Sequence, residues 1–470
     1  MSETVQPLGN ATHGALSIEE HQLDNGLKVL LVERHADPVV AVMVWYKVGA
    51  RNEREHEAGV SHFLEHMMFK GSERFAKGEI DRLTTTLGGS NNAFTSSDHT
   101  AYWFELASDR WEKALEIEAD RMRGLNLDAR EFASERAVVL EELSMGLDDP
   151  WRRISDLVQG TLFLRHPYRR PVIGHADALK RLSVDEMRDY HRRFYHPGNA
   201  TVVVCGDIDM ADALARVKQH FAAIPAGIPY EQADPFRPAE EPVGGERRVQ
   251  LTWDDEGKRL CIAWPSAPVG TPDDAALDVL STLLTGGRLS RLHRRLVIDE
   301  ELATSVSSFN DTRVEGGVFW IFAECAQGVE PRALEAALDG ELELVMQEKV
   351  PARELARVRS LLEAAEAYDH ETTSDVAEQI GEAAVDAHWR LAFESLPNAL
   401  KVDATRLRDC AKRVLARERR VLGWCLPAKE EERRSNLRRI GVALRRSTHA
   451  AKEKAAQHKK SGKSRKGGGR

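Results

Sequence analysis

A group of side chains able to bind a metal lies at positions 62–66, which read His62-Phe63-Leu64-Glu65-His66. If this segment is helical, His62 and His66 lie one turn apart on the same face. Two imidazoles at that spacing can bind one Zn²⁺, and the carboxylate between them can act as a base. Because only three of the five positions are fixed, an ordinary helix that happens to carry two histidines is the alternative.

The residues around this pentad favour a helix with one buried face. Gly71 is placed to end it. An apolar stripe at helical spacing lies apart from the histidines and consists of Val60, Phe63, Leu64, Met67 and Met68. We therefore expect the polar side chains to be carried on a helix whose other face is buried, which would keep them in fixed positions.

A third metal ligand is expected elsewhere, because catalytic zinc usually takes three protein ligands and leaves one position for water. Residues 131–143 read as a long helix. On it, Glu135 and Glu142 are seven residues apart and share a face, whereas Glu141 points about 100° away. We expect Glu141 to lie in solvent.

The partners of Glu135 and Glu142 depend on how far this helix is buried. It carries apolar residues at Val138, Val139 and Leu143, so we expect it to be at least half buried. A buried carboxylate needs a partner. A metal is one candidate, and an ion pair with Arg136 or Arg121 is the other.

These residues resemble a known family. An H-x-x-E-H motif, followed 76 residues after its last His by the second acid of an E-x(6)-E pair, is similar to the inverted zinc-motif peptidases of the pitrilysin and insulysin class, peptidase family M16. Within it, the chain most resembles the branch of mitochondrial processing peptidase and its bacterial relatives (subfamily B-like). The resemblance runs from about Ser17 to about Pro427. Supporting matches are Asn25-Gly26, residues 89–102, Pro167-Tyr168, Ile173-Gly174, Tyr195-His196-Pro197 and Gly206-Asp207.

The resemblance implies a role for each acid and imidazole. His62, His66 and Glu142 would bind one Zn²⁺ per chain, Glu65 would be the catalytic base, and Glu135 would be a catalytic supporting acid near the metal. Bound zinc lowers the pKa of its water from ~15.7 towards ~7. Glu65 would take that proton as the peptide carbonyl is attacked and pass it to the leaving amine. The predicted function is a zinc-dependent endopeptidase.

Residues 90–106 are rich in strand-forming residues and contain no Pro. The resemblance implies that this region supplies an edge strand that pairs with an extended peptide substrate at Asn92, Ala93 and Phe94. An ordinary central strand is the alternative. Asp98 and His99 can also be read as metal ligands, but the predicted zinc site is complete without them.

The chain divides into two halves of similar plan. We expect a flexible N-terminus at 1–16, a zinc-binding peptidase domain at 17–225, a Pro- and Gly-rich linker at 226–245, and a homologous domain without the metal motif at 246–428. The predicted fold class is α+β, with two homologous α/β-layer domains whose mostly antiparallel sheets form a clam shell. A C-terminal extension at 429–470 should be basic and disordered from about 445.

Active members of the resembled family also carry, in the second half, an Arg and a Tyr seven residues later that hold the substrate carbonyl. Alignment on residues 286–292 places these positions at Val297 and Thr304, and neither can replace them. Loss of one such donor typically costs about 10²–10³ in rate. We expect a heterodimer whose homologous partner subunit supplies the pair. The alternatives are substitution by one of the nearby arginines or an ordinary solvated basic face; the arginines are Arg288, Arg291, Arg294 and Arg295.

The hydropathy, the first 16 residues and the cysteines indicate in which cellular compartment the protein is expected. No apolar run approaches ~18 residues, so no membrane span is expected. The first 16 residues contain no Lys or Arg and no apolar core of a signal peptide. The five Cys lack C-x-x-C spacing and read as buried free thiols, which favours the bacterial cytoplasm.

Residues 445–470 have a net charge of +9 in a chain of −9. Such a tail can touch nucleic acid, an acidic partner or lipid, but is more often only solubilising; no nucleic acid is required.

The main alternative function is a non-catalytic scaffold subunit of the same fold, like the core subunits of respiratory complexes. Such subunits typically lose the metal motif, whereas this chain keeps all five residues, namely His62, Glu65, His66, Glu135 and Glu142. A peptide-binding module that does not turn peptides over is a further alternative, because Val297 and Thr304 stand where the family has Arg and Tyr. Metal content and cleavage would separate these classes.

Overall fold

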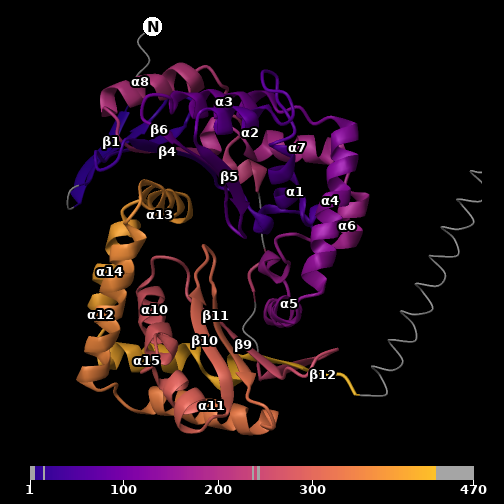
Figure 1. The fold of residues 1–470 in the computed structure, drawn as a ribbon, viewed down its shortest axis with the longest axis vertical. Coiled ribbons are helices and arrows are strands. Elements are labelled where there is room, and N and C mark those ends of the chain that lie inside the picture. The colour runs from indigo at the N-terminus through magenta and orange to yellow at the C-terminus, as the bar shows by residue number, and fades with distance from the viewer. Residues whose placement is uncertain (1–5, 14–15, 235–237, 241–243, 430–470) are drawn as a thin grey trace, which may run out of the picture.

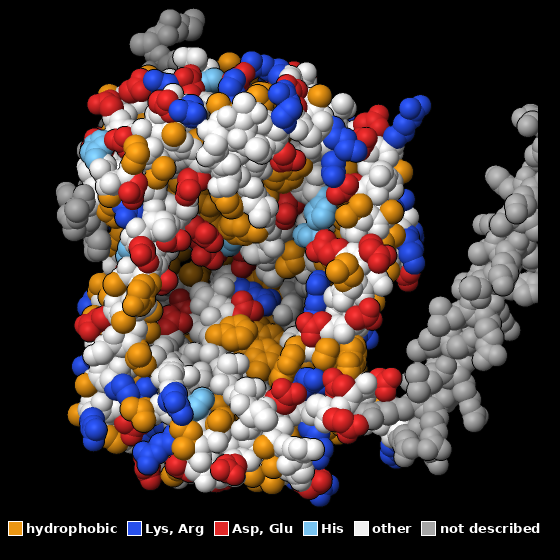
Figure 2. All heavy atoms as spheres, viewed as in Figure 1, with side chains coloured by type: hydrophobic (Ala, Val, Ile, Leu, Met, Phe, Trp, Pro, Cys, Tyr) orange, Lys and Arg blue, Asp and Glu red, His pale blue; other side chains and the backbone are white. Residues whose placement is uncertain are grey.

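The computed structural model describes residues 6–13, 16–234, 238–240 and 244–429. They form two layered halves that face each other across a hollow (Figures 1 and 2). The predicted α+β fold, with two homologous halves arranged as a clam shell, is confirmed. The predicted C-terminal extension lies, apart from residue 429, outside the described residues. In the described ranges, no helix combines the length and the apolar character needed to span a bilayer.

The first half contains a seven-stranded sheet. Its spatial order is β1 (Gln6–His13), β2 (Leu16–Gln22), β3 (Lys28–Glu33), β7 (Ala200–Gly206), β4 (Val39–Tyr46), β6 (Thr100–Ala107) and β5 (Ser90–Thr95). All neighbours are antiparallel except β3 and β7, which are parallel. The strand β5 therefore lies at one edge of the sheet, and β1 lies at the other.

The second half contains a five-stranded sheet that repeats this order. From one edge to the other it runs β8 (Arg247–Trp253), β12 (Val421–Pro427), β9 (Arg259–Pro265), β11 (Val318–Cys325) and β10 (Ala303–Asp311). Its one parallel pair, β12 with β8, corresponds in position to the pair of β7 with β3 in the first sheet. The two sheets thus share one topology, in which β10 occupies the place of β5.

The N-terminal segment contains a strand. Within residues 1–16, for which flexibility is predicted, Gln6–His13 form β1 and pair antiparallel with β2. Without β1, the N–H and C=O groups on the outer edge of β2 would have no strand partner, and edge strands favour such pairing. The register shifts once, between Pro7 and Gly9, because Pro lacks the N–H group that a ladder needs.

Helices cover both sheets (Figure 1). Those of the first half are α1 (Val60–Met67), α2 (Glu79–Thr86), α3 (Glu112–Gly124), α4 (Ala129–Leu147), α5 (Pro150–Leu162), α6 (Ala176–Arg181), α7 (Val184–Phe194), α8 (Met210–Phe221) and α9 (Tyr230–Ala233). Those of the second half are α10 (Pro272–Thr285), α11 (Pro331–Gln347), α12 (Ala352–Asp369), α13 (Thr373–Asp386), α14 (Leu391–Leu400) and α15 (Ala404–Val414), with a π-helical segment, His293–Asp299. The five Cys are buried and unpaired, as predicted.

Two helices pack on the sheet of the opposite half. Helix α13, from the second half, covers the face of the first sheet that its own helices leave open, where Ile380 meets Trp45 and Met43. Helix α5, from the first half, covers the second sheet, where Ile154 and Val158 are buried. Burying one such aliphatic side chain contributes about 1.5–3 kcal/mol. The two halves are therefore held together by apolar packing as well as by the chain that links them.

The contact of α13 with the first sheet depends on Gly381. A Cβ atom at this position would lie 2.0 Å from Nε1 of Trp45, whose side chain is fully buried. Only a residue without a side chain allows the helix to approach the indole this closely. Gly381 thus sets the distance between α13 and the sheet.

We predict that Gly381→Ala lowers the free energy of unfolding by about 1–3 kcal/mol, because a methyl group has no space against Trp45. The control is Gly340→Ala on α11, where the nearest atoms belong to the flexible end of Arg295, at 3.3 Å. This control should be neutral or stabilising by up to about 1 kcal/mol. Urea unfolding followed by circular dichroism measures both. Equal effects of the two substitutions would contradict close packing at Gly381.

Candidate metal centre and active site

Helix α1 carries the pentad and begins at an unusual cap. Its N-cap residue, Gly59, has φ 95°, in the left-handed region that favours glycine. Glu53 supplies the acceptors that a capping side chain would normally provide. Its carboxylate accepts hydrogen bonds from the backbone N–H groups of Gly59 (2.8 Å) and Ser61 (2.9 Å). Since Glu53 is buried, these two bonds fix the start of the helix at Val60, two residues before His62.

The remaining face of α1 is buried as predicted, with Val60, Phe63, Leu64, Met67 and Met68 fully covered. The helix is therefore held on one side by the core and at its N-terminus by Glu53. Its other face presents His62 and His66, whose rings are 4.8 Å apart. The imidazoles keep fixed positions because the helix that carries them cannot rotate without exposing this apolar stripe.

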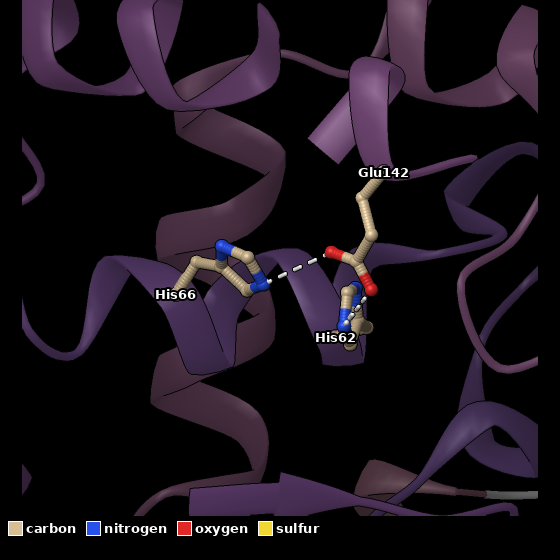
Figure 3. A group of neighbouring side chains, drawn as sticks. All are labelled: His62, His66 and Glu142. Carbon is tan, nitrogen blue, oxygen red and sulfur yellow. Dashed lines mark ion pairs between the residues drawn. The ribbon is translucent and has the colours of Figure 1, made fainter. Parts of the chain in front are cut away.

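Glu142 comes to these two imidazoles from α4 (Figure 3). Its carboxylate oxygens lie 3.6 Å from Nε2 of His62 and 3.5 Å from Nε2 of His66. One ligand atom from each residue lies within 4.8 Å of the others. Two imidazoles and one carboxylate are a donor set that catalytic zinc takes. The side chains of His62, His66 and Glu142 are 14%, 22% and 42% exposed, so the site is open to water and substrate.

The charge state of His62 suits a metal ligand. Burial, and then the charges of His66 and Arg152, lower the pKa of His62 to about 4. The ring is therefore neutral near pH 7 and has a lone pair to share, which binding to a metal requires. The residues of the pentad and Glu142 fit a zinc ion.

Glu135 lies behind His66. Its carboxylate accepts a hydrogen bond from Nδ1 of His66 (3.0 Å) and is 2.7 Å from Nζ of Lys70. Burial acts to raise the pKa of Glu135, but Lys70 and His66 outweigh it, so the pKa is lowered and the group stays charged. A proton held on Nδ1 leaves Nε2 of His66 free to face the metal position. Glu135 thereby orients a predicted ligand.

The alternative partners expected for the two acids of α4 are engaged elsewhere. Arg121 pairs with Glu118, and Arg136 donates to the carbonyl of Leu182. The cation that Glu135 contacts is Lys70, one turn beyond His66, which sequence reasoning missed. Its signal was its spacing of four residues from His66. On the same helix, Val139 is buried as expected, whereas Val138 is 49% exposed because it lies on the opposite face.

Glu65 faces the edge strand. The hydroxyl of Thr95, the last residue of β5, donates a hydrogen bond to Glu65 Oε2 (2.5 Å). Burial raises the pKa of Glu65, and the charge of Glu142 adds to this, whereas Thr95 and His66 oppose it. A carboxylate with a raised pKa accepts protons more readily near neutral pH. Thr95 was missed in the sequence; its signal was its position two residues after Ala93, on the same face of the strand.

The predicted substrate-binding residues lie on an edge strand. β5 pairs with β6 alone, in the register Ser90–Glu105 to Thr95–Thr100, so the interpretation as a central strand was wrong. Asn92 is exposed, Ala93 packs against the core that includes α1, and the ring of Phe94 meets Trp45 on the other face. The free edge of β5 ends beside Glu65 and has backbone groups to pair with an extended chain.

The two positions aligned with the Arg and Tyr of the family lie in the second half. Val297 packs against the core of that half, and the hydroxyl of Thr304 donates to the carbonyl of Glu324. Most of the nearby arginines are engaged there: Arg291 pairs with Glu354, Arg294 with Asp299, and Arg295 with Glu300. Besides Lys70, Arg152 is a cation near the metal position. Its charge acts on His62, and its guanidinium lies against Gly146, one turn beyond Glu142.

Asp98 and His99 do not join the zinc residues. Asp98 accepts hydrogen bonds from the hydroxyl of Tyr168 (2.5 Å) and the backbone of Val314 (3.1 Å), and pairs with Arg51 (2.9 Å). It therefore ties the first half to the loop between β10 and β11. His99 contacts α13.

Known proteins share this architecture. A family model described as "Insulinase (Peptidase family M16)" matches residues 28–176, and one described as "Peptidase M16 inactive domain" matches residues 181–362. Zinc protease PqqE of Helicobacter pylori is 31% identical over 79% of this chain and 84% of that protein. An uncharacterized zinc protease of Mycobacterium leprae is 32% identical over 65% of this chain and 68% of that protein.

Solved structures of other proteins have the same fold. A protease from Helicobacter pylori has a TM-score of 0.83 and 28% identity, over 87% of this chain and 99% of that one. The periplasmic protease PqqL from Escherichia coli has a TM-score of 0.74 over 90% of this chain and 48% of that one; at 19% identity it supports the fold alone. The two family models, the relatives and the fold lead to the same conclusion: the chain belongs to peptidase family M16, the insulinase family.

Proposed function

We propose that this chain is a zinc-dependent endopeptidase that binds an extended peptide along β5 and cleaves it beside α1. The observation that carries the proposal is the hydrogen bond between Thr95 and Glu65. It sets the candidate base, which lies on the same helix as His62 and His66, at the end of the edge strand β5. Base, metal ligands and a peptide-binding edge thus occupy one place.

The chain's residues divide the chemistry among them. His62, His66 and Glu142 would hold one zinc ion. Bound there, zinc supplies a water of lowered pKa and polarises the peptide carbonyl. Glu65 accepts a proton from the attacking water, to which its raised pKa is suited, and delivers it to the leaving amine. Glu135 holds the ring of His66 in position, and β5 aligns the peptide through its backbone groups.

Two kinds of comparison support a protease. Relatives that share about a third of their residues with this chain carry the name zinc protease. The matched family model of the first half is that of the insulinase peptidases. A scaffold subunit would have no use for a preorganised imidazole pair with a buried orienting acid behind it.

The second half suggests a partner subunit. Val297 and Thr304 are engaged within their own half and lack the donors of the family's Arg and Tyr. The family model that covers residues 181–362 is described as an inactive domain. We therefore propose a heterodimer in which a homologous chain supplies the Arg and Tyr.

The five buried free Cys suit a reducing compartment such as the bacterial cytoplasm.

Glu65→Gln should keep zinc and abolish peptide cleavage, because the amide cannot accept the proton of the attacking water. Zinc content by mass spectrometry and turnover of a fluorogenic peptide library test the two parts separately. Glu141→Gln is the matched control, since Glu141 is an exposed acid one residue before Glu142 and should change neither value. Retained turnover in Glu65→Gln would remove Glu65 from the role of base.

Glu53→Ala should weaken zinc binding without touching a ligand. It leaves the buried N–H groups of Gly59 and Ser61 without acceptors, at a cost of about 1–3 kcal/mol each. We expect a lower melting temperature and a weaker zinc affinity in competition with a chelator. Glu55→Ala, which removes an acid exposed by 64% nearby, should cost less than about 1 kcal/mol and leave the affinity unchanged. An unaltered zinc affinity in Glu53→Ala would mean that the cap does not position α1.

The purified chain alone should bind zinc but cleave peptides poorly, by about 10²–10³-fold or more relative to the complex with its partner, because the carbonyl donors are missing. Turnover is measured with and without a homologous subunit that has the Arg and Tyr but lacks H-x-x-E-H. Full turnover by the lone chain would refute the heterodimer. Zinc binding with no turnover under any condition would favour a peptide-binding subunit, as the residues Val297 and Thr304 allow.

A further inference from the structure

A second group of metal-binding side chains lies where α13 meets the turn between β5 and β6. It consists of His99, Glu382 and Asp386, and one ligand atom from each lies within 4.8 Å of the others. Nδ1 of His99 is 2.9 Å from Oδ1 of Asp386. His99 belongs to the first half, whereas the two acids belong to the second. No residue of this group takes part in the proposed zinc site.

Packing holds this group in place. The ring of His99 lies against two aromatic rings. Its centroid is 5.1 Å from that of Trp45 and 6.0 Å from that of Phe94. Glu382 and Asp386 are four residues apart on α13, so they share a face of the helix. The side chains of His99 and Asp386 are 5% and 10% exposed, while Glu382 completes the group from the open side. A buried imidazole–carboxylate pair with an open third ligand is a built site rather than a chance meeting on the surface.

The surroundings lack positive charge. Glu382 and Asp386 also line a cavity of about 310 Å³, whose wall carries four further carboxylates and no Lys, Arg or His; they are Asp274, Asp278, Glu366 and Asp369. Glu382 makes no hydrogen bond or ion pair to any described residue, and the buried Oε1 of Gln379 in the same wall has no hydrogen-bond partner. Acidic side chains gather at the hollow between the halves in Figure 2.

The titration of the neighbouring groups agrees with this excess of negative charge. Burial, and then the charge of Asp274, raises the pKa of Asp278 to about 7. A bound cation would relieve this effect.

We propose that His99, Glu382 and Asp386 bind a second divalent metal ion, of the class that accepts imidazole together with carboxylates, such as zinc or manganese. An imidazole ligand argues against calcium and magnesium, which prefer oxygen ligands alone. Ligand atoms at ~2.0–2.2 Å from one ion lie roughly 3.3 Å apart. The present separations, from 2.9 Å to at most 4.8 Å, require side-chain rotation rather than backbone movement.

Such an ion would join the two halves beside the peptide-binding edge. Its imidazole ligand, His99, is four residues beyond Thr95, the last residue of β5. Its two carboxylate ligands lie in the last turns of α13. The ion would fix α13 against the turn that follows β5. This site stands independently of the proposed peptidase activity, because none of its residues is a proposed zinc ligand or the candidate base.

The experiment counts metal ions in the full chain after dialysis against Zn²⁺ and, separately, Mn²⁺. His62→Ala/His66→Ala empties the first site and should retain one ion per chain, whereas the unaltered chain should retain two with Zn²⁺. Adding Glu382→Gln and Asp386→Asn to the double variant should reduce the content to below about 0.1 ion per chain. Equal metal content with and without these two additional substitutions would overturn the proposal.

Matched controls are Glu366→Gln and Asp369→Asn, two acids on α12 that line the same cavity outside the group. They should leave one ion bound in the double variant. If they reduce the metal content as much as Glu382→Gln does, the cavity attracts cations diffusely and the defined site is refuted. Far-ultraviolet circular dichroism verifies folding. Co²⁺ provides a second readout, since His99→Asn should change its visible absorption if the imidazole is a ligand.

Discussion

The packing of α13 and α5 on each other's sheets is the constraint on which the rest of the structure depends. Each sheet has one face covered by helices of its own half and needs a second apolar layer to exclude water. The missing layer comes from the opposite half, through Ile380 against the first sheet and Val158 against the second. Apolar burial of this kind is favourable over the whole contact area, so neither sheet can lose its partner helix without exposing core.

The packing of α5 and α13 on the sheets of the opposite halves also positions the candidate active site. Helix α4, which carries Glu135 and Glu142, is separated from α5 by two residues, and Asp149 caps α5 through the N–H of Trp151. Docking α5 on the second sheet therefore fixes the end of α4 near the metal position. On the other side, α13 supports Trp45 and Phe94 beneath β5. The ligand helix and the peptide-binding edge are thus both braced by contacts between the halves.

The two halves share one sheet topology but differ in the residues that accompany it. β10 occupies in the second sheet the place that β5 occupies in the first, but no H-x-x-E-H helix accompanies it. Instead, the loop after β10 reaches the first half, where the backbone of Val314 bonds to Asp98 and Glu315 meets His166. The second half has the same sheet without the H-x-x-E-H motif, and its loop after β10 contacts the first half. A fold is retained by its core, whereas chemistry resides in a few side chains that the core does not need.

By itself, the sequence determined the local part of this protein. The spacing of His62 and His66, the shared face of Glu135 and Glu142 and the buried stripe of α1 follow from the 3.6-residue turn, which short segments reveal. Only the tertiary structure decided the pairings between distant segments. Thr95 bonds to Glu65 across 30 residues, Glu135 to His66 across 69, and His99 to Asp386 across 287. Helical periodicity cannot encode these contacts, because they depend on how apolar layers pack, and that is a property of the whole chain.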